Sequence, residues 1–227
     1  AGLFQAVTYS LTSETKVNQY ALEATAPIRL AMPMSEERSV LRLSVVPHLL
    51  EVISHNVARQ IDSVAIYETG SVFLSKGEND LPIEKEHLAG AVTGLWQTHP
   101  WQGEKKAVDF YVVKGILDGL FRLLGLESRI EYQQSAIEGL HPGRTAKVSL
   151  DGNTVGFIGQ VHPTVQKEQD LHETYVFELS LEALLEAEVA SVTYNAIPRF
   201  PSMTRDIALV VDEKIAAGDI QKVITEA

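Results

Sequence analysis

Residues 145–161 read TAKVSLDGNTVGFIGQV, and this stretch predicts a β-hairpin. Thr145–Leu150 and Thr154–Val161 are rich in apolar and β-branched residues, as strands are. Asp151-Gly152-Asn153 lies between them and is a strong hairpin-turn signal, because Asp-Gly adopts the backbone angles of a tight turn easily. A hairpin joins antiparallel neighbours, so a largely antiparallel sheet is expected.

Further segments favour strands, and helices lie between them. Apolar or β-branched runs predict strands, or strand-like segments, at Phe4–Leu11, Val64–Leu74, His87–Trp96, Arg129–Gln134, Tyr175–Leu179 and Ser191–Ala196. Apolar residues at helical spacing predict a helix that starts near Pro47 (Leu49, Leu50, Ile53, Val57), a helix over Asp109–Leu124 that ends before Gly125, and a short helix over Leu181–Leu185 with Ser180 as its N-cap. The fold class is therefore α+β, with helices packed on a largely antiparallel sheet.

A domain boundary is expected at Ile197–Ser202, which contains two prolines. Beyond it stand a predicted strand, Ile207–Val211, and a predicted helix that begins near Gly218. One strand and one helix cannot bury a core of their own, so residues 1–196 form the main domain and residues 197–227 are an appendage or the start of a truncated second domain. The chain begins with Ala and stops inside a helical pattern, which suggests a piece of a longer polypeptide, although removal of an initiator Met explains the first feature equally well.

The composition excludes several classes of protein. With 227 residues, 45% hydrophobic and 22% charged, the chain is an ordinary globular one. Its net charge of −11 does not suit tight binding to nucleic acid, so such a role would need a local patch or a partner. The sequence has no cysteine and no apolar run of about 18 residues, which rules out disulfides, thiolate chemistry and a membrane span, and a cytoplasmic location is expected.

Common catalytic signatures are absent from the sequence, including the P-loop, GxGxxG, GxSxG and HExxH. His48 and His55 could share a helix face, but nothing nearby completes a metal site. Glu68 is a carboxylate in an apolar strand, and such a group is more often ion-paired than catalytic. His141 and Arg144 could line a charged pocket, but a turn in which Arg144 pairs with a carboxylate across the sheet is the favoured interpretation.

Two tryptophans, Trp96 and Trp101, lie on either side of Gln97–Pro100. They could form a platform on which a base or a ring stacks. A loop that is buried against the sheet is the favoured interpretation, because large aromatic side chains usually bury most of their surface.

An ordered set of motifs resembles the bacterial phenylalanyl-tRNA synthetase β chain and covers nearly the whole sequence. The set comprises Val7–Leu11, Met32–Glu37, Ser39–Arg42, Tyr67–Phe73, Val108–Phe110 with Lys114-Gly115, Leu140–Arg144, Gly156–Gly159 with His162-Pro163, and Phe200–Ser202 with Arg205-Asp206. The residues of these motifs singled out as structural or interface candidates are Arg42, Glu68, Asp109, His141, Arg144, His162, Arg205 and Asp206.

The resemblance implies a module of a larger ligase. The family forms an (αβ)2 assembly that joins phenylalanine to its tRNA with ATP and magnesium, and the α chain carries the active site. Residues 1–196 would be a domain similar in fold to the class II synthetase core, and residues 197–227 the start of a ferredoxin-like anticodon-binding domain. Gly2–Thr8 would be the strand of the first class II motif, whose preceding helix helps build the subunit interface and would lie before Ala1. Gln5 and Tyr9 depart from that motif.

The same comparison implies that this domain is not catalytic. Class II active sites hold ATP with an Arg-x-Glu strand and a glycine-rich strand that ends in Arg. Here Ile66 stands where that first Arg would be, and Gly156–Gly159 continues to Gln160, Val161 and His162. No catalytic, cofactor-binding or metal-binding residue is therefore expected in this chain. Alternatives are a stand-alone acid–base enzyme that uses Glu68 and His141, and a tRNA-binding module, which the net charge disfavours.

Overall fold

The computed structural model describes residues 2–77, 80–99, 101–189, 194 and 196–226. The chain divides into two compact units, residues 1–190 and residues 191–227. Among the described helices, none has the length and the apolar run needed to cross a bilayer.

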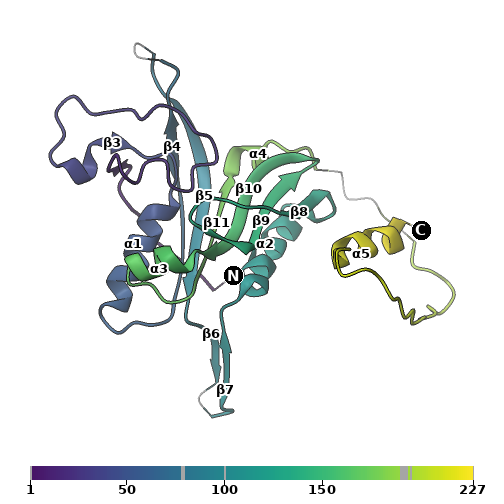
Figure 1. The fold of residues 1–227 in the computed structure, drawn as a ribbon. Coiled ribbons are helices and arrows are strands. Elements are labelled where there is room, and N and C mark those ends of the chain that lie inside the picture. The colour runs from purple at the N-terminus through teal and green to yellow at the C-terminus, as the bar shows by residue number, and fades with distance from the viewer. Residues whose placement is uncertain (1, 78–79, 100, 190–193, 195, 227) are drawn as a thin grey trace. The chain divides into compact units, whose positions relative to one another are not determined.

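A seven-stranded sheet forms the centre of the first unit (Figure 1). In spatial order its strands are β1 (Phe4–Gln5), β4 (Val64–Leu74), β5 (Ile83–Thr93), β11 (Thr174–Ser180), β10 (Asn153–Val161), β9 (Leu140–Leu150) and β8 (Ile130–Gln134). Every neighbouring pair is antiparallel except β1 and β4, which run parallel. The largely antiparallel sheet expected from the hairpin is thus confirmed. Two small sheets join β2 (Leu11–Thr12) to β3 (Val40–Leu41) and β6 (Leu95–His99) to β7 (Glu104–Ala107).

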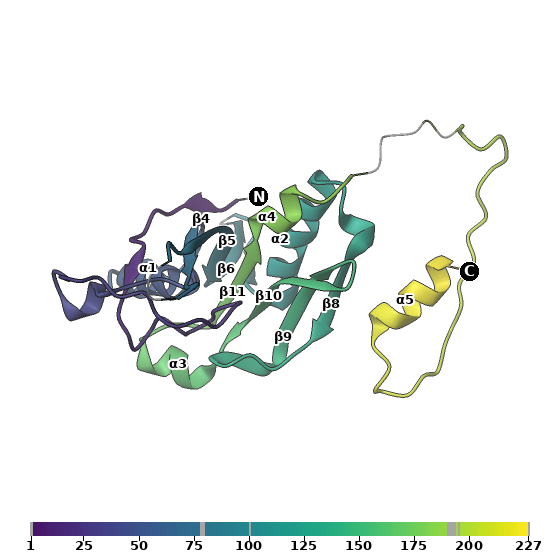
Figure 2. The ribbon, with the colours of Figure 1, turned by 90° about the horizontal axis from the view of Figure 1, so that it is seen from above.

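Helices cover both faces of the sheet, as Figures 1 and 2 show. Helix α1 (Val46–Val57) packs on β4, β5 and β11, and α2 (Phe110–Leu123) packs on β10 and β11. The other helical segments are α3 (Pro163–Glu168), α4 (Leu181–Leu185) and the 3-10 turns η1 (Glu36–Arg38) and η2 (Glu127–Arg129). Successive residues of a strand point to opposite faces, so Val176 joins the core under α1 with Leu49, and Phe177 joins the core under α2 with Leu117.

The predicted hairpin is β9–β10. Asn153 pairs with Leu150, so Asp151 and Gly152 form a two-residue turn. Both have positive φ angles, 50° and 81°, as a type I′ turn requires. The first strand begins at Leu140, earlier than the expected Thr145. A register shift between Gly159 and Val161 of β10 lets the pairing of the two strands continue past Pro142-Gly143 to Leu140.

The predicted helices are confirmed with their end signals. Pro47 lies in the first turn of α1, where its missing N–H costs no hydrogen bond. Asp109 precedes α2 as its N-cap, and its carboxylate accepts a hydrogen bond of 2.7 Å from the N–H of Val112. Ser180 caps α4 in the same way.

Two predicted strands of this unit differ from the structure. The segment Phe4–Leu11 is not one strand: β1 ends at Gln5, and β2 begins only at Leu11. The backbone leaves the sheet between them, and Thr8 there bonds the side chain of Glu68 instead of continuing the ladder. The apolar run His87–Trp96 divides at Gly94 into the end of β5 and the start of β6.

In the second unit, the helix expected near Gly218 is confirmed as α5 (Ala217–Glu226). The strand expected over Ile207–Val211 is wrong, since this segment is irregular and its apolar side chains are exposed. A strand needs a neighbour for its backbone hydrogen bonds, and the described residues of this unit contain no strand to pair with it. The strand expected over Ser191–Ala196 falls mostly outside the described residues.

The N-cap of α2 yields a stability prediction. Replacing Asp109 with Ala leaves the N–H of Val112 without its acceptor, so the free energy of unfolding is expected to fall by about 1 kcal/mol. Urea unfolding followed by circular dichroism measures the change. Asp109→Asn, which keeps an acceptor oxygen, should lose much less, and equal losses for the two variants would contradict the capping role.

Candidate functional site

Two carboxylates lie in the middle of the sheet, on the face that α1 covers. Glu68 of β4 and Glu178 of β11 are both paired in register with Ala89 of β5, so they occupy one row across three strands. Strands are spaced about 4.8 Å apart, which places the two positions roughly 10 Å from each other. Glu68 is 3% exposed and Glu178 is fully buried, so both carboxylates need partners within the protein.

Arg42 and Thr8 satisfy Glu68. Arg42 Nη1 donates to Glu68 Oε1 at 2.9 Å, and Thr8 Oγ1 donates to Glu68 Oε2 at 2.7 Å. Arg42 also donates to the hydroxyl of Thr8 at 3.0 Å and, through Nε, to the carbonyl of Ser71 at 3.0 Å. The guanidinium lies against Gly70, where a Cβ atom would come within 2.3 Å of Arg42 Nη2. Because Gly70 has no side chain, there is room beside the strand for the guanidinium of Arg42.

Glu178 is satisfied by the start of α1 and by His87. Its carboxylate accepts hydrogen bonds from Ser44 Oγ at 2.5 Å, from the N–H of Val45 at 3.2 Å and from the N–H of Val46 at 3.4 Å. His87 Nδ1 of β5 donates to the other side of the carboxylate at 2.7 Å. The residue before α1 is Val45, which has no capping side chain. Glu178 therefore caps α1 from the sheet, and its negative charge faces the positive end of the helix dipole.

This arrangement leaves the central carboxylates little chemistry of their own. Each is already surrounded by hydrogen-bond donors from the same chain. Among the described residues, no group of three or more His, Asp or Glu side chains could hold a metal ion. The cation of this face, Arg42, is 3% exposed and committed to Glu68.

His48, on α1, is a buried histidine with one unused ring nitrogen. Its Nε2 lies 3.0 Å from the carbonyl oxygen of Leu11 and donates to it, while Nδ1 has no partner in the part of the chain that the structure describes. Burial lowers the pKa of His48 from its ordinary value of 6.5, against smaller opposing effects of the Leu11 hydrogen bond and of Glu51. Folding thus favours the neutral form of this histidine.

The second predicted group, His141 and Arg144, lies at the other end of the sheet. Arg144 Nη1 donates to Gln160 at 2.9 Å and lies 3.4 Å from a carboxylate oxygen of Glu173, so the pairing with a carboxylate is confirmed. The hydroxyl of Tyr175 donates to the same oxygen of Glu173 at 2.6 Å, and burial together with this bond raises the pKa of Tyr175 to about 12. His141 Nδ1 accepts from the N–H of Gly143 within its own turn.

The alternative of an acid–base pair between Glu68 and His141 is wrong. Three strands separate β4 from β9, which places the two residues roughly 19 Å apart. Glu68 is also bound by Arg42, so its lone pairs are not available to a substrate.

The remaining candidate residues have separate places. His162 is the N-cap of α3 and accepts from the N–H of Thr164 at 3.2 Å. Arg205 and Asp206 lie in the second unit and are exposed. The roles of these residues in an interface remain predictions.

Sequence reasoning missed Glu178, His87, Ser44 and Thr8. Glu178 carries the same signal as Glu68, a carboxylate inside an apolar run, which indicates a buried charge that needs partners. The partners themselves had no such signal, because Ser44 is 134 residues away along the chain from Glu178.

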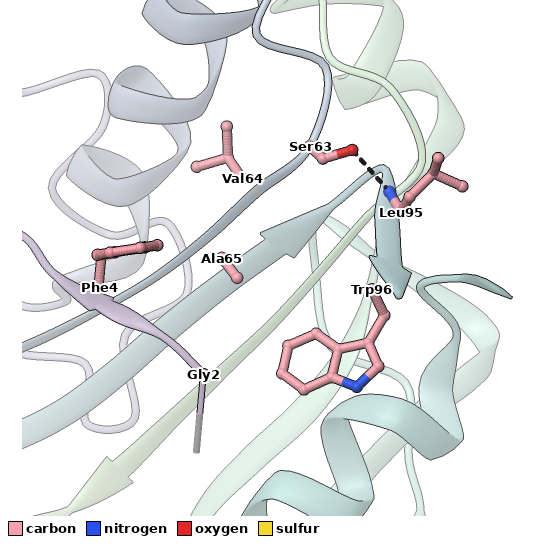
Figure 3. Close-up of a pocket in the computed structure, with 7 residues that line it drawn as sticks. All are labelled: Gly2, Phe4, Ser63, Val64, Ala65, Leu95 and Trp96. Carbon is pink, nitrogen blue, oxygen red and sulfur yellow. Dashed lines mark hydrogen bonds between the residues drawn. The ribbon is translucent and has the colours of Figure 1, made fainter. Parts of the chain in front are cut away.

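A hollow of about 220 Å³ opens beside the edge strand β1, and Figure 3 shows its lining. Phe4 of β1, Val64 and Ala65 of β4 and Trp96 of β6 surround it, and the N–H of Leu95 donates to Ser63 Oγ at 2.9 Å on its rim. The phenyl ring of Phe4 is 78% exposed. The hollow is small and has no charged side chain in its lining, which suits an uncharged side chain better than a nucleotide.

Comparison with known sequences gives long, close matches. The profile of the family described as "Phenylalanyl tRNA synthetase beta chain CLM domain" matches residues 1–181. The chain is 64% identical over 227 residues to the phenylalanine–tRNA ligase β subunit of Geobacillus kaustophilus and 59% identical to that of Bacillus subtilis. Each match covers the whole chain but 28% of the relative, so the chain spans little more than a quarter of these proteins.

Comparison with solved structures supports the fold. The crystal structure of pyrrolysyl-tRNA synthetase from Desulfitobacterium hafniense superposes with a TM-score of 0.58 at 14% sequence identity, over 81% of this chain and 62% of that one. At this identity the likeness concerns the fold alone. It confirms the expected synthetase-like core of an antiparallel sheet flanked by helices.

The Arg42–Glu68 pair yields a second stability prediction. Arg42→Met leaves an uncompensated carboxylate in the core and is expected to lower the free energy of unfolding by about 3–5 kcal/mol. The double variant Arg42→Met/Glu68→Leu removes both charges, so it should be more stable than the single variant. Urea unfolding of the four proteins of this cycle measures the coupling. A double variant that is less stable than Arg42→Met would contradict the pairing.

The buried His48 yields a pH prediction. Because its pKa is lower in the folded than in the unfolded chain, the unfolded chain binds more protons below pH 6.5, and acidification destabilises the fold. The stability that depends on a neutral His48 is fully present above pH 6.5. It is lost as the pH falls from 6.5 toward the lower pKa of His48 in the folded protein. His48→Gln keeps a donor for the carbonyl of Leu11, so its free energy of unfolding should fall less on acidification than that of the wild type. Identical pH dependence of the two proteins would contradict this origin.

Proposed function

The chain belongs to the phenylalanyl-tRNA synthetase β-chain family, and from this premise we propose that it is a non-catalytic assembly module of the ligase. The module supports an α subunit, which carries the active site and attaches phenylalanine to its tRNA. ATP and magnesium belong to the reaction at the α subunit, within an (αβ)2 assembly. Residues 197–227 are the start of the anticodon-binding domain.

The observation that carries this proposal is the internal pairing of the charges on the α1 face of the sheet. An ATP site needs cations that face an open cavity and a substrate phosphate. Here the buried cation Arg42 is bound to Glu68, and Glu178 is enclosed by Ser44, His87 and the start of α1. Ile66 occupies the position where an Arg-x-Glu strand would supply its arginine. Arg144, a cation beside the glycine-rich strand β10, is already shared between Gln160 and Glu173.

Exposed apolar side chains near β1 support the contact with the α subunit. Phe4, Val7 and Tyr9 are 78%, 87% and 65% exposed, in the segment that resembles the first class II motif. Met32 and Met34 are 89% and 102% exposed in the motif that follows. Large apolar side chains that stand together on a surface favour a protein partner. Edge strand β1 and the hollow beside Phe4 form the surface that receives part of that partner.

A stand-alone role in tRNA binding fits less well. The net charge of −11 opposes the sequence-independent attraction to phosphates on which such binding depends. Contact with tRNA therefore belongs to the assembled ligase rather than to this chain alone.

ATP binding tests the proposal. Isothermal titration calorimetry of the chain with magnesium–ATP is expected to give no saturable heat, because Arg42 and Arg144 are already paired within the chain and are not offered to the triphosphate. The same titration on the chain combined with the α subunit should give saturable binding, which serves as the positive control. Saturable binding by the chain alone, or adenylate formation without the α subunit, would overturn the proposal.

A further inference from the structure

The tip of the β6–β7 hairpin has no role in the function proposed so far. It extends away from the main sheet (Figure 1), and Trp101 at its turn is 89% exposed. The expectation that the tryptophan loop is buried against the sheet is therefore wrong for Trp101. It holds in part for Trp96, which packs against the core under α2.

The turn presents Trp101 on an ordered backbone. The N–H groups of Gln102 and Gly103 both donate to the carbonyl oxygen of His99, at 3.1 and 2.8 Å. These two bonds order the backbone that carries residue 101, so the ring is held at the end of the hairpin and faces solvent. An ordered backbone reduces the conformational entropy that is lost on binding.

Two cations follow the turn. Lys105 is paired in register with Thr98, and Lys106 with Gln97, so both lie within about three residues of the tip, or roughly 10 Å along the strand. Both lysines are exposed, and among the described side chains neither forms an ion pair. With Glu104 beside them in the sequence, the two lysines leave β7 with a net positive charge, on a chain whose net charge is −11.

The surroundings of Trp101 favour a nucleic acid over a protein. A tryptophan that anchors a protein interface is usually ringed by other apolar groups that exclude water. Around this turn the described exposed side chains are polar, namely Gln97, Thr98, His99, Gln102, Lys105 and Lys106. An isolated indole next to cations instead matches sites where an unpaired base stacks on a ring while lysines contact the phosphates.

We propose that the tip of the β6–β7 hairpin binds an unpaired segment of RNA, with a base stacked on Trp101 and phosphates near Lys105 and Lys106. This inference rests on the proposed function, because the ligase brings a tRNA to the assembly. It adds a contact of this chain that is separate from the sheet face covered by α1 and from edge strand β1.

Binding of tRNA to the assembled ligase tests the site. Trp101→Ala is expected to weaken the affinity for a tRNA transcript by roughly 5- to 100-fold, the range measured for loss of one base–aromatic stack. Lys105→Ala/Lys106→Ala is expected to reduce the slope of log affinity against log salt by about 0.7 for each lysine. Filter binding over a range of salt concentrations measures both quantities.

Two variants serve as controls. Trp101→Phe keeps a stacking surface and should retain most of the affinity. Tyr111→Ala removes another exposed ring, 76% accessible on α2, and should leave the affinity unchanged. Because the chain has two tryptophans, Trp96→Phe leaves Trp101 as the sole indole, whose fluorescence should be quenched by single-stranded oligoadenylate and much less by a blunt RNA duplex.

The outcomes separate this site from the proposed function. Unchanged affinity and salt slope, in a ligase that still assembles and aminoacylates, would overturn the hairpin site and leave the assembly role intact. Loss of co-elution with the α subunit in Trp101→Ala would make the tip a protein contact and would equally overturn the RNA proposal. Failure of the wild-type chain to assemble with an α subunit would instead count against the proposed function.

Discussion

The burial of two carboxyl groups at the centre of one sheet face is the constraint on which the rest of the first unit depends. Removing Glu68 and Glu178 from water would cost several kcal/mol each without compensation. The compensating groups come from the segment that ends in α1: Arg42 for Glu68, and Ser44 with the first N–H groups of the helix for Glu178. The position of α1 on the sheet is therefore set by charge as well as by the packing of its apolar residues against β4, β5 and β11.

That constraint has a consequence for function. On a catalytic face the charged groups point toward the substrate. They are held ready without a partner of their own, and the charge of the substrate pairs with them when it binds. On this face the charges of Glu68 and Glu178 are paired within the chain. The surface features that remain open to a partner lie at the periphery of the sheet. They are the hollow beside Phe4 of β1 and the exposed Trp101 in the turn of the β6–β7 hairpin. The geometry of the chain thus directs binding to its edges and away from the centre of the sheet.

The parts of the fold that the sequence predicts well have local signals. Val64–Leu74 was delimited by its composition, the β9–β10 turn by Asp151-Gly152, and α2 by Asp109 and its apolar stripe. Predictions failed where structure depends on distant partners. Ile207–Val211 has strand composition but no strand beside it, and the carboxylate of Glu178 is bound by a serine 134 residues away. The resemblance to a family identified Arg42 and Glu68 as residues of interest, but their ion pair comes only from the three-dimensional contact.

An acidic chain can still carry an RNA contact if the contact is far enough from the bulk of its charge. The five residues of β6 rise about 3.3 Å each, so the tip of the hairpin lies roughly 16 Å from the end of β5. At physiological ionic strength the field of a charge decays over about 8 Å, so the acidic residues of the main domain are largely screened at Trp101, and less so at Lys105 and Lys106. A phosphate at the tip therefore interacts mainly with the charges of the hairpin itself. Net charge excludes a broad nucleic-acid surface on this chain, but it does not exclude a local one at the end of a protruding ribbon.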